Sequence, residues 1–173
     1  MSQKKGMNLQ FFSILLVFIV FCVSCGGNYM SPERALRNFS NRIEQGNFDS
    51  LTLTIYYMDV STIRFPITGE ELVRLEWYDH KIIVDSDALK KHVELLRQIS
   101  ADNLIPVSHE LPVIATLYYV FSVNNQKIFG VVPQPDEVNS SMIINGIEFE
   151  WDDVFFDVVR PFLPKDLSWL WDG

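Results

Sequence analysis

Two short turns constrain the fold of this chain more than any other feature of its sequence. Asn145-Gly146 separates two short apolar runs within 142–149, and Asn124-Asn125 separates the strand-like segments 115–123 and 127–132. Asparagine and glycine tolerate the positive φ angles that two-residue hairpin turns require. The sequence therefore predicts two antiparallel β-hairpins in the second half of the chain.

Further strands are predicted from alternation of apolar and polar residues. In the segment 51–59, leucine and isoleucine alternate with threonine and tyrosine, which is the period of a half-buried strand. A short strand is expected at 81–84, and 63–67 is a further candidate despite Pro66. The segment 72–77 fits either a strand or a short helix.

Three helices are predicted from caps and helical spacing. The first begins at a Ser31 cap and stops at Gly46, and the second opens at Asp85. The second carries an apolar stripe made of Leu89, Val93, Leu96 and Ile99. A last helix is expected over 152–159, where Pro161 would stop it.

Strands joined by tight turns and interrupted by helices are typical of the α+β class. We expect an antiparallel sheet built from hairpins, with two or three helices packed on one face. The chain has 173 residues, of which 48% are hydrophobic and 13% aromatic, a composition that argues against disorder. A single globular domain over 31–173 is therefore predicted.

The first thirty residues have the organisation of an export signal. Lys4 and Lys5 precede a continuous apolar run over 11–23, and Ser24 and Cys25 are followed by two glycines. This segment resembles the signals of bacterial lipoprotein precursors, although Cys22 stands where such signals usually carry leucine. The resemblance implies a signal peptide over 1–24, cleaved behind Ser24. It also implies a lipidated Cys25 that begins a tether over 25–30.

By that resemblance, the protein would be anchored on the extracytoplasmic face of the cell membrane. Each buried methylene contributes about 0.8 kcal/mol to anchoring, so a two-chain lipid gives stable attachment. An uncleaved transmembrane helix is the first alternative, but the strongly apolar stretch is shorter than the roughly 20 residues that span a bilayer. Cleavage followed by secretion is the second alternative.

Charge and cysteine usage limit the possible partners. The formal net charge is −8, and an acidic surface repels the phosphate backbone, so nucleic acid is not expected as a partner. The only cysteines are Cys22 and Cys25, so the remaining domain can form no disulfide and offers no thiolate to a metal. The expected partners are the membrane, through lipid on Cys25, and an envelope protein or glycan.

The residues that could carry chemistry form no recognised motif. Glu148 and Glu150 head an acidic cluster that continues through 152–157, and such carboxylates could act as acid and base on a polysaccharide. A solvated acidic face is the simpler interpretation. The three histidines lack the spacing of zinc ligands, and no serine elbow or phosphate loop is present. Neither a metal nor a cofactor is therefore expected.

Aromatic side chains supply the remaining indication of function. Tyrosine and tryptophan occur in adjacent pairs, and neighbouring strand residues point to opposite faces of a sheet. Exposed members of such pairs suit contacts with protein or carbohydrate. The candidate binding residues are Trp77, Tyr78, Trp169, Trp171, Glu148 and Glu150. Packing of these rings in the core is the alternative. We therefore expect a binding module, with a carboxylate-dependent hydrolase as the second hypothesis.

Overall fold

The computed structural model describes residues 30–58, 66–102, 104–107, 113–135 and 140–165. The chain divides into two units, 1–30 and 31–173, and all the described helices and strands lie in the second. In the described part of the chain, no helix combines the length and the apolar character that crossing a bilayer requires. The apolar run at 11–23 lies outside the described residues.

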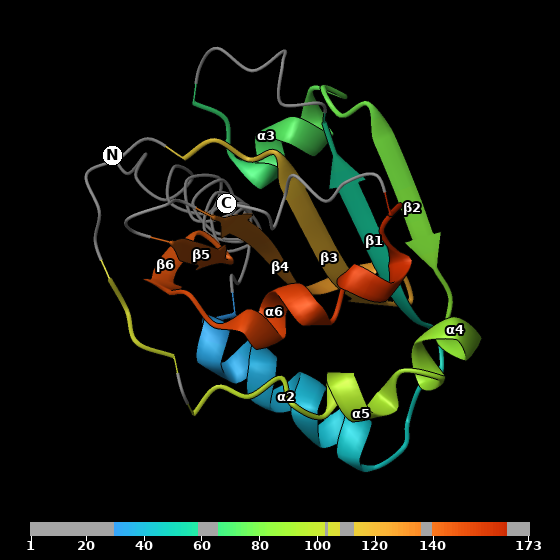
Figure 1. The fold of residues 1–173 in the computed structure, drawn as a ribbon. Coiled ribbons are helices and arrows are strands. Elements are labelled where there is room, and N and C mark those ends of the chain that lie inside the picture. The colour runs from blue at the N-terminus through green and yellow to red at the C-terminus, as the bar shows by residue number, and fades with distance from the viewer. Residues whose placement is uncertain (1–29, 59–65, 103, 108–112, 136–139, 166–173) are drawn as a thin grey trace, which may run out of the picture. The chain divides into compact units, whose positions relative to one another are not determined.

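The domain is built on one antiparallel sheet, which confirms the α+β class (Figure 1). Its six strands lie in the order β2-β1-β3-β4-β5-β6. Their bounds are β1 Leu51–Tyr57, β2 His80–Val84, β3 Leu117–Val123, β4 Gln126–Gln134, β5 Ser141–Ile144 and β6 Ile147–Glu150.

Both predicted hairpins are confirmed. Asn124 and Asn125 join β3 to β4 with φ angles of 51° and 62°, and Asn145 and Gly146 join β5 to β6 with 50° and 84°. Positive φ at both central positions matches the twist of the strands on either side. The alternation in β1 is confirmed too, since its odd-numbered residues are buried and its even-numbered residues are half-buried.

One face of the sheet is covered by helices α2 Pro32–Glu44, α4 Ser86–Lys90, α5 Val93–Leu96 and α6 Asp153–Asp157 (Figure 1). The Phe39 ring of α2 packs on Phe121 and Phe129 of the sheet, with ring centroids 4.8 and 5.2 Å apart. Each such fully buried side chain contributes about 1.5–3 kcal/mol to folding. This face therefore holds the main hydrophobic core.

The first predicted helix is confirmed, whereas the prediction of one continuous second helix is wrong. In α2, the Ser31 side chain accepts a hydrogen bond from the Arg34 N–H, which caps the helix as expected. The second helix is instead two short helices, α4 and α5, interrupted at Lys91 and His92. The His92 backbone leaves the helical region, and its ring lies 5.0 Å from that of Phe162.

The last predicted helix is shorter than expected. Helix α6 ends at Asp157, and a 3-10 helix, η2 Arg160–Phe162, follows it. Pro161 lies within that 3-10 helix rather than terminating α6, because a proline near the start of a helix gives up no internal hydrogen bond.

Helix α3 Gly69–Arg74 packs on the opposite face of the sheet, against β3 and β4. The segment 72–77, which fitted either a strand or a short helix, therefore begins inside a helix, since α3 extends to Arg74. The Thr68 hydroxyl accepts a hydrogen bond from the Glu71 N–H, and the Glu71 carboxylate accepts one from the Thr68 N–H, so the pair forms a capping box at the start of α3. The candidate strand at 63–67 lies outside the described residues except for its end, where Ile67 bridges to the segment around Ile114.

Candidate functional site

The face of the sheet that carries α3 is hollowed at two adjoining places. The first hollow, here called the α3 cavity, has a volume of about 220 Å³ and is lined by Thr68, Gly69, Glu70, Val113, Tyr118, Gly130, Val132, Ile143, Asn145, Gly146 and Glu148. The second, here called the sheet groove, has a volume of about 320 Å³ and is lined by Thr54, Tyr56, Glu70, Val73, Arg74, Tyr118, Val120, Ser122 and Lys127. Glu70 and Tyr118 line both hollows and therefore form the boundary between them.

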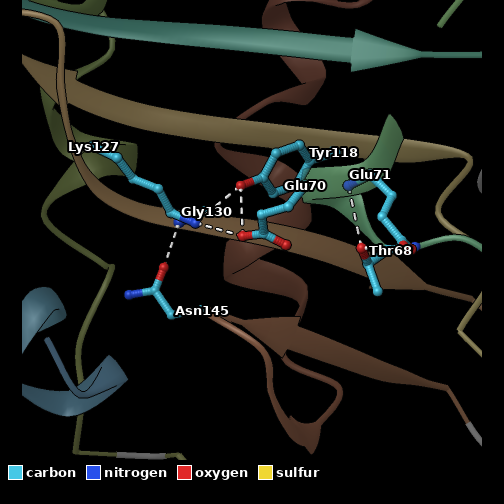
Figure 2. A network of polar contacts seen from close by, with 7 residues as sticks. All are labelled: Thr68, Glu70, Glu71, Tyr118, Lys127, Gly130 and Asn145. Atoms are coloured by element: carbon cyan, nitrogen blue, oxygen red, sulfur yellow. Dashed lines mark hydrogen bonds and ion pairs between the residues drawn. The ribbon is translucent and has the colours of Figure 1, made fainter. Parts of the chain in front are cut away.

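The boundary is a closed triangle of polar contacts (Figure 2). The Lys127 Nζ lies 2.6 Å from the Glu70 Oε1 and 3.0 Å from the Tyr118 hydroxyl oxygen. The Tyr118 hydroxyl also lies 3.1 Å from the same Glu70 oxygen. Three elements contribute one side chain each, since Glu70 comes from α3, Tyr118 from β3 and Lys127 from β4.

The surroundings of Glu70 keep its carboxylate ionised at neutral pH. Partial burial alone would raise the pKa of Glu70, but the hydrogen bond and the charge of Lys127 outweigh it and lower the pKa below its usual value. The side chains of Glu70 and Lys127 are 49% and 31% exposed, so solvent screens the pair and its contribution to stability is modest. The pair therefore serves mainly to hold both side chains in position.

Two glycines allow the Tyr118 ring to reach this position. A Cβ atom on Gly69 would lie 2.4 Å from the ring's Cδ2, and one on Gly130 would lie 2.4 Å from the hydroxyl oxygen. Non-bonded carbon atoms pack at about 3.5–4.0 Å, so neither position has room for a side chain. The ring therefore packs directly against the backbone of the first residue of α3 and of the middle of β4.

The β5–β6 turn is attached to the same part of the sheet. The Gly130 N–H donates to the Asn145 Oδ1 at 3.0 Å (Figure 2). The Asn145 N–H donates to the Gly130 carbonyl oxygen, also at 3.0 Å. This pair of bonds fixes the turn beside Tyr118, where Asn145 lines the α3 cavity.

The structure separates the two predicted glutamates. Glu148 is half-buried, lines the α3 cavity and accepts a hydrogen bond from the buried Ser141 hydroxyl at 2.7 Å. Glu150 is exposed and does not belong to the cavity lining. Glu148 therefore shares the α3 cavity with Glu70, a residue that the sequence interpretation had not selected.

The remaining members of the acidic cluster have local roles. Asp152 caps α6 through the Val154 N–H, and Asp157 pairs with Arg160 at 3.0 Å. The Trp151 indole N–H donates to Asp153 at 2.7 Å. Among the described residues, no group of three or more histidine, cysteine, aspartate or glutamate side chains is arranged to hold a metal ion.

The predicted aromatic residues fall in different environments. Trp77 is 45% exposed, whereas Tyr78 is half-buried and contacts Tyr56 at 4.9 Å between ring centroids. Tyr56 in turn stacks on Tyr118 at 6.3 Å, so a row of three rings crosses the α3 side of the sheet. Trp169, Trp171, Ser24 and Cys25 lie outside the described residues.

Sequence reasoning missed the residues that build the boundary. Lys127 and Glu70 are 57 positions apart, so no local pattern pairs them. Two signals were nevertheless present. Thr68 and Glu71 have the spacing of a capping box, which predicts a helix start, and a glycine inside a strand, such as Gly130, often marks a close approach.

Comparisons of this chain with protein families, with curated proteins and with solved structures find no match. The site must therefore be interpreted from its own geometry. A concave hollow with apolar walls and a few fixed polar groups is the usual form of a ligand site. The α3 cavity has this form, with Val113, Val132 and Ile143 as walls and Glu70, Asn145 and Glu148 as polar groups.

Proposed function

We propose that this chain is a lipoprotein anchored through lipid on Cys25, and that its extracytoplasmic domain is a module that binds an envelope protein or wall polymer. The α3 cavity is the proposed binding site. The observation that carries this proposal is the polar triangle of Glu70, Tyr118 and Lys127. It is fixed in advance at the rim of a hollow, on the sheet face opposite the main core.

A prearranged site favours binding because its groups need not be ordered when the ligand arrives. The Tyr118 ring is held by the two glycines, and Asn145 is held by the Gly130 backbone. The side chains that face a ligand therefore lose little conformational entropy on association. This argument concerns affinity and requires no reaction.

Hydrolysis of an envelope polysaccharide remains the second candidate because two carboxylates, Glu70 and Glu148, line the same cavity. A glycosidase requires one of its two carboxyl groups to be protonated at working pH. The lowered pKa of Glu70 opposes that role. Glu148 would then have to be the acid. Release of reducing ends from an envelope polysaccharide fraction by the wild-type chain, abolished in Glu148→Gln, would establish this alternative.

Mass spectrometry of the N-terminus tests the anchor. We expect the chain extracted from membranes to begin at Cys25 with a diacylglyceryl group on its sulfur. The Cys25→Ser variant should lose this group and leave the membrane fraction. An unmodified thiol, or an unchanged membrane partition of the variant, would overturn the anchor.

Retention on envelope material tests the binding site. The full chain, in a non-ionic detergent, is passed over immobilised wall-polymer and envelope-protein fractions. Ile143→Trp fills the α3 cavity, whereas Ile147→Trp makes the same change at a residue that is 44% exposed on β6. We expect the first variant to lose at least tenfold in retention and the second to lose none.

The isosteric change Glu148→Gln keeps the cavity volume and removes one charge, so it separates loss of binding from misfolding. It should also weaken retention, while thermal unfolding remains cooperative. Equal retention of all three variants and the wild type would overturn the proposed site, as would the absence of retention for the wild-type chain.

A further inference from the structure

The sheet groove differs from the rest of the molecule in its charge. The chain has 22 acidic and 14 basic residues, yet among the described residues that line the groove Lys127 and Arg74 are cations and Glu70 is the single acid. Lys81 adds a third cation beside it, because its ammonium lies 5.4 Å from the centre of the Tyr56 ring. The described lining and its neighbour Lys81 thus carry more positive than negative charge, although the chain as a whole is acidic.

We propose that the sheet groove binds the anionic group of an acidic saccharide, with Arg74 and Lys127 on the carboxylate or phosphate and Tyr56 beside the sugar ring. This inference rests on the proposed function, because it names the class of envelope polymer that the module recognises. It adds a second site, which binds the anionic group and shares Glu70 and Tyr118 with the α3 cavity.

The two cations suit different parts of this task. Lys127 is held by Glu70 and by the Tyr118 hydroxyl, contacts that engage two of the three donors of an ammonium group. Its position is therefore set before the ligand arrives. Arg74 lies at the exposed end of α3, and its guanidinium can form paired hydrogen bonds with a carboxylate or a phosphate.

The floor of the groove favours a sugar over a peptide. Strands β1 and β3 are paired on both sides within the sheet, so their backbone groups cannot bind a peptide by strand addition. Recognition must therefore use side chains. Those available are the hydroxyls of Thr54 and Ser122 and the half-buried Tyr56 ring, which provide hydrogen bonds and an apolar surface.

Titration calorimetry of the full chain in non-ionic detergent tests the inference. The probes are a galacturonic acid tetrasaccharide, its methyl ester, glucose 6-phosphate, glucose and a polyglutamate peptide. We expect the acidic tetrasaccharide to bind at least tenfold more tightly than its uncharged ester, with affinity that falls as salt increases. Tighter binding of glucose 6-phosphate than of the tetrasaccharide would assign the anionic group as phosphate rather than carboxylate.

Matched variants locate the binding. Arg74→Gln should weaken the acidic probe about tenfold, whereas Arg34→Gln, at an exposed arginine on α2, should have no effect. Lys81→Gln should give a smaller loss. Three results would each overturn the inference: affinities of both acidic probes equal to those of their uncharged counterparts, the ester and glucose; an unchanged affinity of the tighter acidic probe in Arg74→Gln; or stronger binding of polyglutamate.

Failure of this inference can be distinguished from failure of the proposed function. If Ile143→Trp abolishes retention on envelope polymer while Arg74→Gln does not, the α3 cavity binds the polymer and the proposed anion site in the sheet groove is refuted. If the acidic tetrasaccharide binds through Arg74 although no envelope fraction retains the chain, the groove is supported and the proposed envelope partner is refuted.

Discussion

Replacing Gly130 by alanine tests whether the close packing around Tyr118 organises the site. The added Cβ would lie 2.4 Å from the Tyr118 hydroxyl oxygen and 2.8 Å from two ring carbons. Tyr118 is only 4% exposed, and the backbone at Gly69 also packs closely against its ring. The ring must therefore move, and its hydroxyl would leave Lys127 and Glu70.

The expected cost follows from two opposing effects. Overpacking of a filled core costs about 1–3 kcal/mol. Replacing glycine by alanine in ordinary backbone geometry stabilises by about 0.4–1 kcal/mol, because it restricts the unfolded chain. The clash should win, so Gly130→Ala should lower the free energy of unfolding by about 1–2 kcal/mol. With a typical urea slope, the midpoint would fall by roughly 0.5–1 M.

Urea unfolding in a double-mutant cycle provides the assay. In a Tyr118→Ala background the three atoms nearest to the added methyl group are absent, so Gly130→Ala should be neutral or slightly stabilising. The two changes should therefore couple by about 1–3 kcal/mol. If Gly130→Ala costs the same free energy with and without the Tyr118 ring, the packing argument is refuted.

Three further predictions concern the fold and its charges. Tyr119→Phe should lower stability by about 1 kcal/mol, since the Tyr119 hydroxyl donates to the Phe155 carbonyl oxygen. Burial raises the pKa of Tyr119 well above 10.0, so the folded state of the wild-type chain should lose stability as the pH rises above about 10. Thermal melts at several pH values should show this loss in the wild type but not in the variant. The lowered pKa of Glu70 implies stability that is present above pH 4.5 and lost as the pH falls below it. Lys127→Met should flatten that acid dependence, and an unchanged slope would contradict the pairing. Gly146→Ala should cost about 1 kcal/mol in urea unfolding, because the φ of 84° disfavours a side chain although the space is open.

The parts of the fold that were predictable are those specified by neighbouring residues. The Asn145-Gly146 turn needs only its own φ preferences and short apolar flanks, so the hairpin could be read directly from the sequence. The Ser31 cap is equally local. The continuity of the second helix was not predictable in this way. The predicted apolar stripe is largely buried, but its spacing says nothing about the break at His92.

The site was predictable only in part because its contacts are long-range. The sequence pointed to Glu148 only as a member of an acidic cluster. In the structure, Glu148 lines the α3 cavity because it lies on β6 opposite Ile143 of β5, which lines the same cavity. The contact between Tyr118 and Glu70 joins residues 48 positions apart. It depends on α3 crossing the face opposite the main core, which no periodicity in the sequence specifies.

The outer edge of β6 limits how copies of this protein can assemble. The Glu150 N–H donates to the Ile105 carbonyl oxygen at 2.9 Å, and the Val107 N–H donates to the Glu148 carbonyl oxygen at 3.1 Å. One donor and one acceptor on this border are therefore already occupied, which hinders the addition of a strand here. Growth of a sheet into a ribbon needs an available border on both sides of every copy, so the cover on β6 disfavours such growth. Strand addition at this border of the sheet would first require the segment around Pro106, which bridges to Phe149, to detach.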